Sequence, residues 1–110
     1  MGCDDPQTLQ AVGNMGALLQ DQGKLDLAET LFRRALEGRE RTLGRDHPST
    51  LASLNNLGQV LQEQGKLDLA EPFLRRALEG RERTLGDVHP DTLHTANNLA
   101  SLLKAMAKEK

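Results

Sequence analysis

The apolar residues in the middle of the chain recur at the spacing of an α-helix. Four leucines fall three or four positions apart, with small or polar residues between them: Leu51, Leu54, Leu57 and Leu61. This spacing places all four on one helical face. Proline presets the backbone of a first helical turn, and glycine is common just after a last one, so Pro48 and Gly65 mark the two ends. The pattern predicts a helix from about Pro48 to about Gln64.

A second apolar stripe follows directly and predicts a second helix. Its members are Leu67, Ala70, Leu74, Ala77 and Leu78. Charged residues of alternating sign lie four positions apart on the opposite side, from Glu71 to Arg83, as expected for a solvated face. Gly86 closes this helix after Leu85.

The same two-helix pattern occurs twice and begins a third time. The segment Gln22–Glu29 returns identically as Gln64–Glu71, and Arg33–Gly44 returns identically as Arg75–Gly86. The period is about 42 residues, which is typical of repeat arrays whose units bury their apolar faces against neighbours. We expect a disordered tail over residues 1–4, repeats over 5–46 and 47–88, and a half repeat over 89–110 with one helix from about Pro90 to Lys108. The prediction is an all-α fold of five helices, and the recurring glycine breaks exclude a long coiled coil.

Small residues mark where neighbouring helices should approach closely. They are Gly16, Gly58 and Ala100 on the first helices of the units, and Ala28, Ala35, Ala70 and Ala77 on the second helices. Gly38 and Gly80 stand inside the second helices, where glycine lowers helix stability by roughly 0.5–1 kcal/mol relative to alanine.

Composition narrows the functional classes. Aromatic residues make up 2% of the chain and the net charge is −2, with both signs interspersed. No basic block or aromatic platform is present for a nucleic acid, and no apolar run is long enough for a membrane span. The single cysteine, Cys3, excludes an intrachain disulfide, which fits a reducing compartment or an engineered terminus. We expect a cytoplasmic location.

The repeated residues resemble the tetratricopeptide repeat in its 42-residue form, found in kinesin light chains. The positions that carry the resemblance are Leu57-Gly58, Ala70, Leu74 and Ala77-Leu78, with their counterparts in the first copy, together with His47-Pro48, Asn55-Asn56-Leu57, Gln64-Gly65-Lys66, Ala70-Glu71-Pro72 and Asn97-Asn98-Leu99. The resemblance implies a right-handed superhelical α-solenoid. It also implies that the first (A) helices line a concave groove and the second (B) helices form the convex back. The family usually has isoleucine where Gly38 and Gly80 stand, so we expect Gly38→Ile or Gly80→Ile to stabilise the fold.

Carried over by position, the groove would present polar side chains able to bind a peptide. They are Gln10, Asn14, Gln20, Asn55, Asn56, Gln59, Gln62, His94, Asn97, Asn98, Ser101 and Lys104. Asparagine and glutamine can both donate to and accept from an extended peptide backbone. The alternative is that the asparagines brace neighbouring helices through hydrogen bonds.

The sequence gives little support for a carboxylate clamp, a metal site or a phosphate-binding loop. A chaperone-type carboxylate clamp would need basic residues where Gln10 and His94 stand. His89 and His94 are five positions apart, which does not place two metal ligands on one helical face. The Gly-Lys pairs lack the remaining residues of a phosphate-binding loop. We expect no metal, no cofactor and no enzymatic activity.

Two functional interpretations follow. The first is a protein–protein interaction module that binds a peptide or partner helix in the groove, without nucleic acid or membrane. The second is a structural unit that forms homo-oligomers through the terminal helix, whose apolar face lacks a covering B helix.

Overall fold

Five α-helices make up residues 5–109, the part of the chain that the computed structural model describes. They are α1 (Pro6–Asp21), α2 (Leu25–Leu43), α3 (Pro48–Glu63), α4 (Leu67–Leu85) and α5 (Pro90–Lys108). The five-helix, all-α prediction is confirmed, with boundaries within a residue or two of those expected. The tail predicted for residues 1–4 lies outside the described residues.

The three A helices, α1, α3 and α5, begin in the same way. Each has a proline in its first turn, and the preceding residue caps the helix with its side chain. Nδ1 of His47 and Nδ1 of His89 each accept a 3.0 Å hydrogen bond from the backbone N–H two residues on. These two histidines are therefore helix caps, which satisfy backbone donors that the helix itself leaves unpaired.

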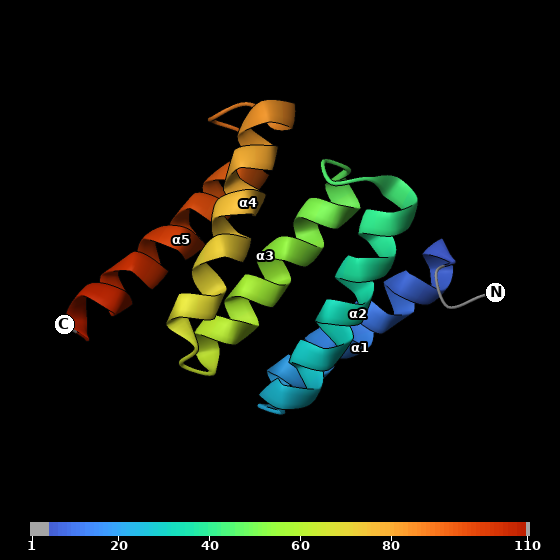
Figure 1. Cartoon of the computed structure of the whole chain (residues 1–110), viewed down its shortest axis with the longest axis horizontal. Coiled ribbons are helices and arrows are strands. Elements are labelled where there is room, and N and C mark those ends of the chain that lie inside the picture. Colours follow the sequence, from blue (N-terminus) through green and yellow to red (C-terminus); the bar gives the residue numbers. More distant parts are fainter. Residues whose placement is uncertain (1–4, 110) are drawn as a thin grey trace.

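The helices form two layers. In Figure 1 the B helices α2 and α4 lie in front of α1, α3 and α5, and each helix packs against the next one along the chain. The turns from A to B helices need Gly23 and Gly65, whose φ angles are +80° and +82°. Glycine adopts this left-handed conformation without the steric cost that other residues meet. The result is a helical repeat solenoid.

The core lies in the seams between the layers, with α3 at its centre. Nine residues of α3 are buried, against three of α1, because α3 has a B helix on each side. Leucine and alanine dominate this core, and Phe32 is its largest fully buried side chain. None of the described helices is apolar over a stretch long enough to cross a bilayer.

Small residues do allow close helix crossings. A Cβ atom added at Gly16 would lie 2.9 Å from Phe32 Cε1, and one at Gly58 would lie 2.6 Å from Leu74 Cγ. The four small B-helix residues are at most 1% exposed: Ala28, Ala35, Ala70 and Ala77. The prediction was wrong for Ala100, which is exposed because no helix in the described part of the chain packs over it.

Gly80 overturns the expectation that isoleucine would stabilise its position. A Cβ atom at Gly80 would overlap Cδ2 of Leu51, and Leu51 is itself only 2% exposed in the core. Overpacking of this kind typically costs about 1–3 kcal/mol. Any larger residue at position 80 must therefore displace the Leu51 side chain at the α3–α4 contact. Gly38 is buried at the matching position of α2, and its substitution stays a prediction.

Candidate protein-interaction surface

The A helices carry the polar residues that the sequence assigned to the groove, but the structure divides them into groups. Six are exposed: Gln10, Asn14, His94, Asn97, Ser101 and Lys104. Five are half-buried: Gln20, Asn56, Gln59, Gln62 and Asn98. Asn55 is buried, at 3% exposure. The twelve positions therefore do not form one uniform binding surface.

Asn55 braces α3 against α5. Its Oδ1 accepts hydrogen bonds from Thr95 Oγ1 at 3.1 Å and from Asn98 Nδ2 at 3.0 Å. Arg81 of α4 donates to the same Thr95 hydroxyl at 2.7 Å and to the carbonyl of Asp91 at 3.1 Å. Burial lowers the pKa of Arg81, and the nearby Asp91 carboxylate opposes that shift. The bracing interpretation thus holds for Asn55 and Asn98.

The junction between the first two repeats has a shorter version of this network. Arg39 donates to Ser53 Oγ at 2.9 Å, as Arg81 does to Thr95. The position that matches Asn55 is Gly13, which has no side chain to accept the next bond. Nothing lies within 4 Å of where its Cβ would be. The first junction therefore lacks the acceptor that completes the second.

Two further bonds join neighbouring A helices. Gln20 donates to Glu63 at 2.5 Å, and Gln62 donates to Ser101 at 3.1 Å. The remaining polar side chains of the predicted groove form no hydrogen bond with other residues of the 5–109 segment: Gln10, Asn14, Asn56, Gln59, His94, Asn97 and Lys104. These seven define the A-helix surface, where amide groups stay free to contact a partner.

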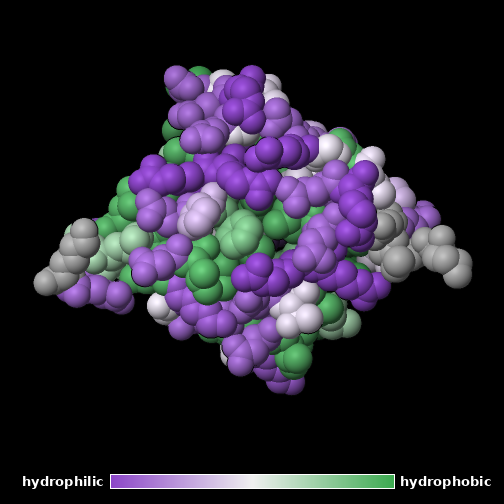
Figure 2. Space-filling model, in the orientation of Figure 1, coloured by the Kyte–Doolittle hydropathy of each residue, from purple (hydrophilic) through white to green (hydrophobic). Residues whose placement is uncertain are grey.

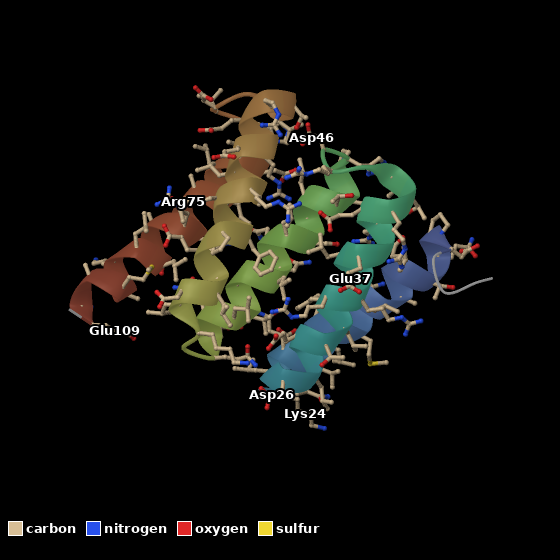
Figure 3. The ribbon with its side chains drawn as sticks, in the orientation of Figure 1. Lys24, Asp26, Glu37, Asp46, Arg75 and Glu109 are labelled. Atoms are coloured by element: carbon tan, nitrogen blue, oxygen red, sulfur yellow. The ribbon has the colours of Figure 1, made fainter. Side chains whose placement is uncertain are left out.

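A series of ion pairs that sequence reasoning missed joins α4, and Lys66 just before it, to α2 and the loop after it. Lys66 pairs with Glu29 at 3.1 Å, Arg76 with Glu40 at 2.5 Å, and Arg83 with Asp46 at 2.7 Å. Figure 3 shows Asp26 and Asp46 near opposite ends of this α2–α4 seam. The charge pattern predicted pairs four positions apart on one helix, whereas these partners are 36 or 37 positions apart. The signal in the sequence that could have indicated these pairs is that the opposite charges are separated by a little less than one repeat.

Two carboxyl groups in this series have lowered pKa values. At Glu29, burial raises the pKa, but hydrogen bonds from Arg33, Lys66 and Gln64 outweigh it and the net shift is downward. At Asp46, the hydrogen bond from Arg83 lowers the pKa. Arg33 also lies over the ring of Phe73 at 5.6 Å from its centroid, a cation–π contact between repeats. These interactions tie α4 to α2 and the loop after it, and they suit a structural role.

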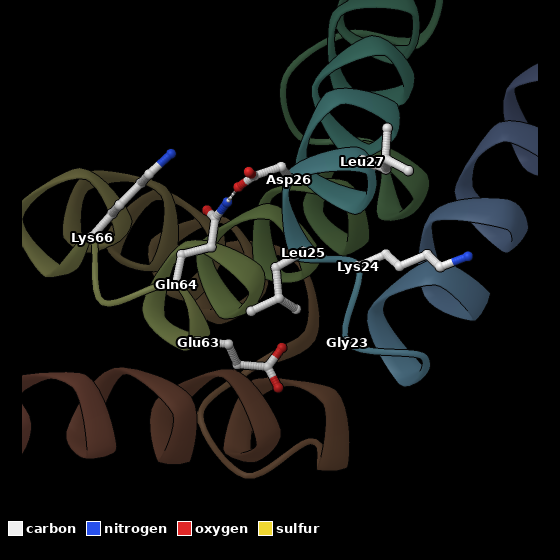
Figure 4. Close-up of a pocket in the computed structure, with 8 residues that line it drawn as sticks. All are labelled: Gly23, Lys24, Leu25, Asp26, Leu27, Glu63, Gln64 and Lys66. Atoms are coloured by element: carbon white, nitrogen blue, oxygen red, sulfur yellow. Dashed lines mark hydrogen bonds between the residues drawn. The ribbon is translucent and has the colours of Figure 1, made fainter.

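An open cleft of about 520 Å³ lies where the α1–α2 turn meets the end of α3 (Figure 4). Its lining mixes leucines with charged residues, and Gln64 donates to Asp26 at 2.6 Å across it. Among residues 5–109, no three His, Cys, Asp or Glu side chains gather closely enough to hold a metal ion.

Known proteins agree with this architecture. The tetratricopeptide repeat family matches residues 7–83 and 52–110. No curated protein sequence is similar enough to match the chain. Among solved structures, BtubC (BKLC) of P. vanneervenii has 25% identity and a TM-score of 0.87 over 96% of this chain and 42% of its own.

A second similar structure is a putative kinesin light chain from Podospora anserina with nearly identical TPR-like repeats. It has 25% identity and a TM-score of 0.80 over 98% of this chain, and a point variant of the same protein has 23% identity and a TM-score of 0.82. The chain spans 42–51% of the length of these structures. The two-layer repeat, the helix boundaries and these matches agree: the chain belongs to the tetratricopeptide repeat family, as an array of the kinesin light chain type.

Proposed function

We propose that the chain binds an extended peptide or a partner helix on its A-helix surface. The tetratricopeptide fold supports a protein-interaction or repeat-scaffold module. The observation that supports binding on the A-helix surface is a set of amide side chains on α1 and α3. They have no hydrogen-bond partner among the described residues: Gln10, Asn14, Asn56 and Gln59. Asn97 extends the set onto α5.

The chemistry of this surface favours peptide backbone over a charged group. Each amide offers two donors and an acceptor, which matches the alternating carbonyls and N–H groups of an extended chain. A clamp for a terminal carboxylate would need cations beside Asn14 and Asn56. Gln10 and His94 stand at those places, so we expect sequence-dependent peptide binding without a requirement for a free C-terminus.

A displayed library of random dodecapeptides, selected on the full chain, tests this proposal. Peptides that bind should lose about tenfold or more in affinity to the double variant Asn14→Ala with Asn56→Ala. The matched control is Gln22→Ala, an exposed amide in the turn after α1. An equal loss of affinity in the Gln22→Ala control, or no loss of affinity in a folded double variant, would show that the peptides bind outside this surface.

Self-association through the terminal helix is the alternative drawn from the sequence. The observation that favours it is the exposure of Leu93 and Leu103, at 48% and 39%. Light scattering over a concentration series tests it, since a constant monomer mass would exclude this role.

A further inference from the structure

The A helices α3 and α5 begin with a histidine cap, whereas α1 begins with an aspartate cap. Oδ1 of Asp5 accepts a 2.8 Å hydrogen bond from the N–H of Gln7. At the matching places Nδ1 of His47 and Nδ1 of His89 each accept a bond of 3.0 Å. The three capping residues have nearly the same backbone angles, with φ from −62° to −64° and ψ from 137° to 141°. One structural position is therefore filled by two kinds of acceptor.

The two kinds of acceptor respond differently to acid. Histidine is the side chain that ordinarily takes up a proton between about pH 8 and pH 5, and its protonated ring carries an N–H on both nitrogens. A protonated Nδ1 cannot accept a bond from the backbone. An aspartate carboxylate ordinarily stays ionised until about pH 4. Mild acid therefore removes the acceptor at α3 and α5 and leaves it at α1.

Both histidines lie where a proton can reach them from water. His47 is exposed and His89 is half-buried. Figure 2 shows largely hydrophilic side chains at the upper end of the molecule, where Figure 1 places the loop from α4 to α5. Protonation of the caps therefore needs no prior unfolding.

The charges around His47 oppose a proton on its ring. Arg39 of α2 donates at 3.4 Å to the carbonyl of the same residue whose N–H His47 caps. The adjacent carboxylate, Asp46, is already paired with Arg83 of α4, and Arg45 adds a further positive charge to this loop. The N-terminus of α3 also has a partial positive charge. A positive imidazole would therefore meet mostly positive charge.

The surroundings of His89 are more balanced. Arg81 of α4 donates at 3.1 Å to the carbonyl of Asp91, the residue whose N–H His89 caps. The carboxylates of Asp87 and Asp91 lie two positions away on either side of the histidine and offset a positive ring. His47 is therefore the more sensitive of the two caps.

The start of α3 connects its cap to the core. The first turn carries Thr50 and Leu51, which are 0% and 2% exposed. The hydroxyl of Thr50 donates to the carbonyl of Gly44 at 2.8 Å, and Leu51 lies against Gly80 of α4. Loosening this turn therefore weakens the α3–α4 packing as well as the end of the helix.

We propose that His47 and His89 make the repeat array acid-sensitive. Protonation opens the caps of α3 and α5 and loosens the starts of these helices, while Asp5 keeps α1 closed. The unfolded chain takes up the same protons without breaking a hydrogen bond, so the stabilisation is present at neutral pH and is lost as the pH falls. This property belongs to the fold and does not depend on peptide binding.

The three histidines of the chain supply a matched set of variants. Asparagine is a good helix cap that does not titrate, so His47→Asn with His89→Asn keeps an acceptor at both places. His94→Asn is the control, because His94 is exposed and forms no hydrogen bond or ion pair with other residues of the 5–109 segment.

Thermal unfolding, followed by circular dichroism at pH 7.5 and pH 5.5, measures the effect. The Tm of the wild type should be lower at pH 5.5 by about 4 °C or more. The double variant should lose most of this difference, and His94→Asn should keep it. Of the two single variants, His47→Asn should remove the larger part.

A second measurement uses the unmodified protein. The ¹H–¹⁵N heteronuclear NOE of the Ser49 and Asp91 amides should fall between pH 7.5 and pH 5.5, whereas that of Gln7 should stay the same. Three results would overturn the proposal: a wild-type Tm that does not change, an equal change in the double variant, and a change that disappears in His94→Asn. If the double variant does not fold, the comparison of Ser49 and Asp91 with Gln7 decides, and equal behaviour of the three amides would overturn the proposal.

Discussion

Asn55 on α3 accepts a 3.0 Å hydrogen bond from Asn98 on α5, and this bond joins two A helices that otherwise touch little. The same Asn55 oxygen accepts from Thr95, which in turn receives Arg81 from α4. One buried amide thus connects three helices at the second repeat junction. Within this network, removing a single group should leave several others without partners.

Substitution of Asn55 by alanine should destabilise the fold by about 1–3 kcal/mol. Thr95 and Asn98 would both lose their acceptor, and an unpaired buried polar group carries a full desolvation cost. Urea denaturation of wild type and variant measures the change. Asn97→Ala, an exposed asparagine on α5, should shift stability by less than about 0.5 kcal/mol. Similar effects at the two positions would argue against the bracing role.

Gly80→Ala should destabilise the protein by about 1 kcal/mol, although alanine is the better helix former. The gain in helix propensity is up to about 1 kcal/mol, whereas forcing a methyl into Leu51 costs about 1–3 kcal/mol. Thermal unfolding measures the net change in stability from these two effects. In a Leu51→Ala background, where the obstructing side chain is gone, the same glycine substitution should become neutral or stabilising. A loss that persists unchanged in that background would mean Leu51 is not the obstruction.

Acid should destabilise the wild type more steeply than Glu29→Gln. The pKa of Glu29 in the folded state lies below its ordinary value of 4.5, so as pH falls the unfolded chain takes up this proton first. Its contribution is therefore present above about pH 4.5 and is lost as pH drops through the folded pKa. Urea midpoints at pH 7, 4.5 and 3.5 should converge for the two proteins as the pH falls. If the two urea midpoints differ by the same amount at all three pH values, the lowered pKa of Glu29 does not contribute to stability.

The helices and their ends could be predicted because local signals agreed with the tertiary arrangement. Pro48 and Gly65 act on their own backbone, so their effect is visible in a single sequence. The burial of Asn55 was harder to predict, because the sequence alone does not distinguish an asparagine that faces solvent from one that faces a neighbouring A helix. Only the register of α3 against α5 distinguishes them.

The error at Gly80 has a similar origin. Helix propensity argued for a larger residue, and the opposing contact comes from Leu51, in a helix that the chain forms about thirty positions earlier. Local preference was overridden by packing. The α2–α4 ion pairs were missed because each partner, taken alone, resembles an ordinary solvated charge.

Gly13→Asn should stabilise the protein by about 1 kcal/mol. It would place at the first junction the amide that Asn55 supplies at the second, in a position with open space for a side chain. Its Oδ1 could accept from Ser53 and Asn56, the counterparts of Thr95 and Asn98, and each such bond contributes about 0.5–1.5 kcal/mol.

Replacing a helical glycine raises stability by itself, so the network must be separated from helix propensity. A double-mutant cycle with Asn56→Ala does this, because the bond to Asn56 cannot form in that background. The stabilisation by Gly13→Asn should shrink by about 0.5–1 kcal/mol there, whereas that by Gly13→Ala should stay the same. Equal behaviour of asparagine and alanine at position 13 would show that the second junction's network cannot be transferred to the first.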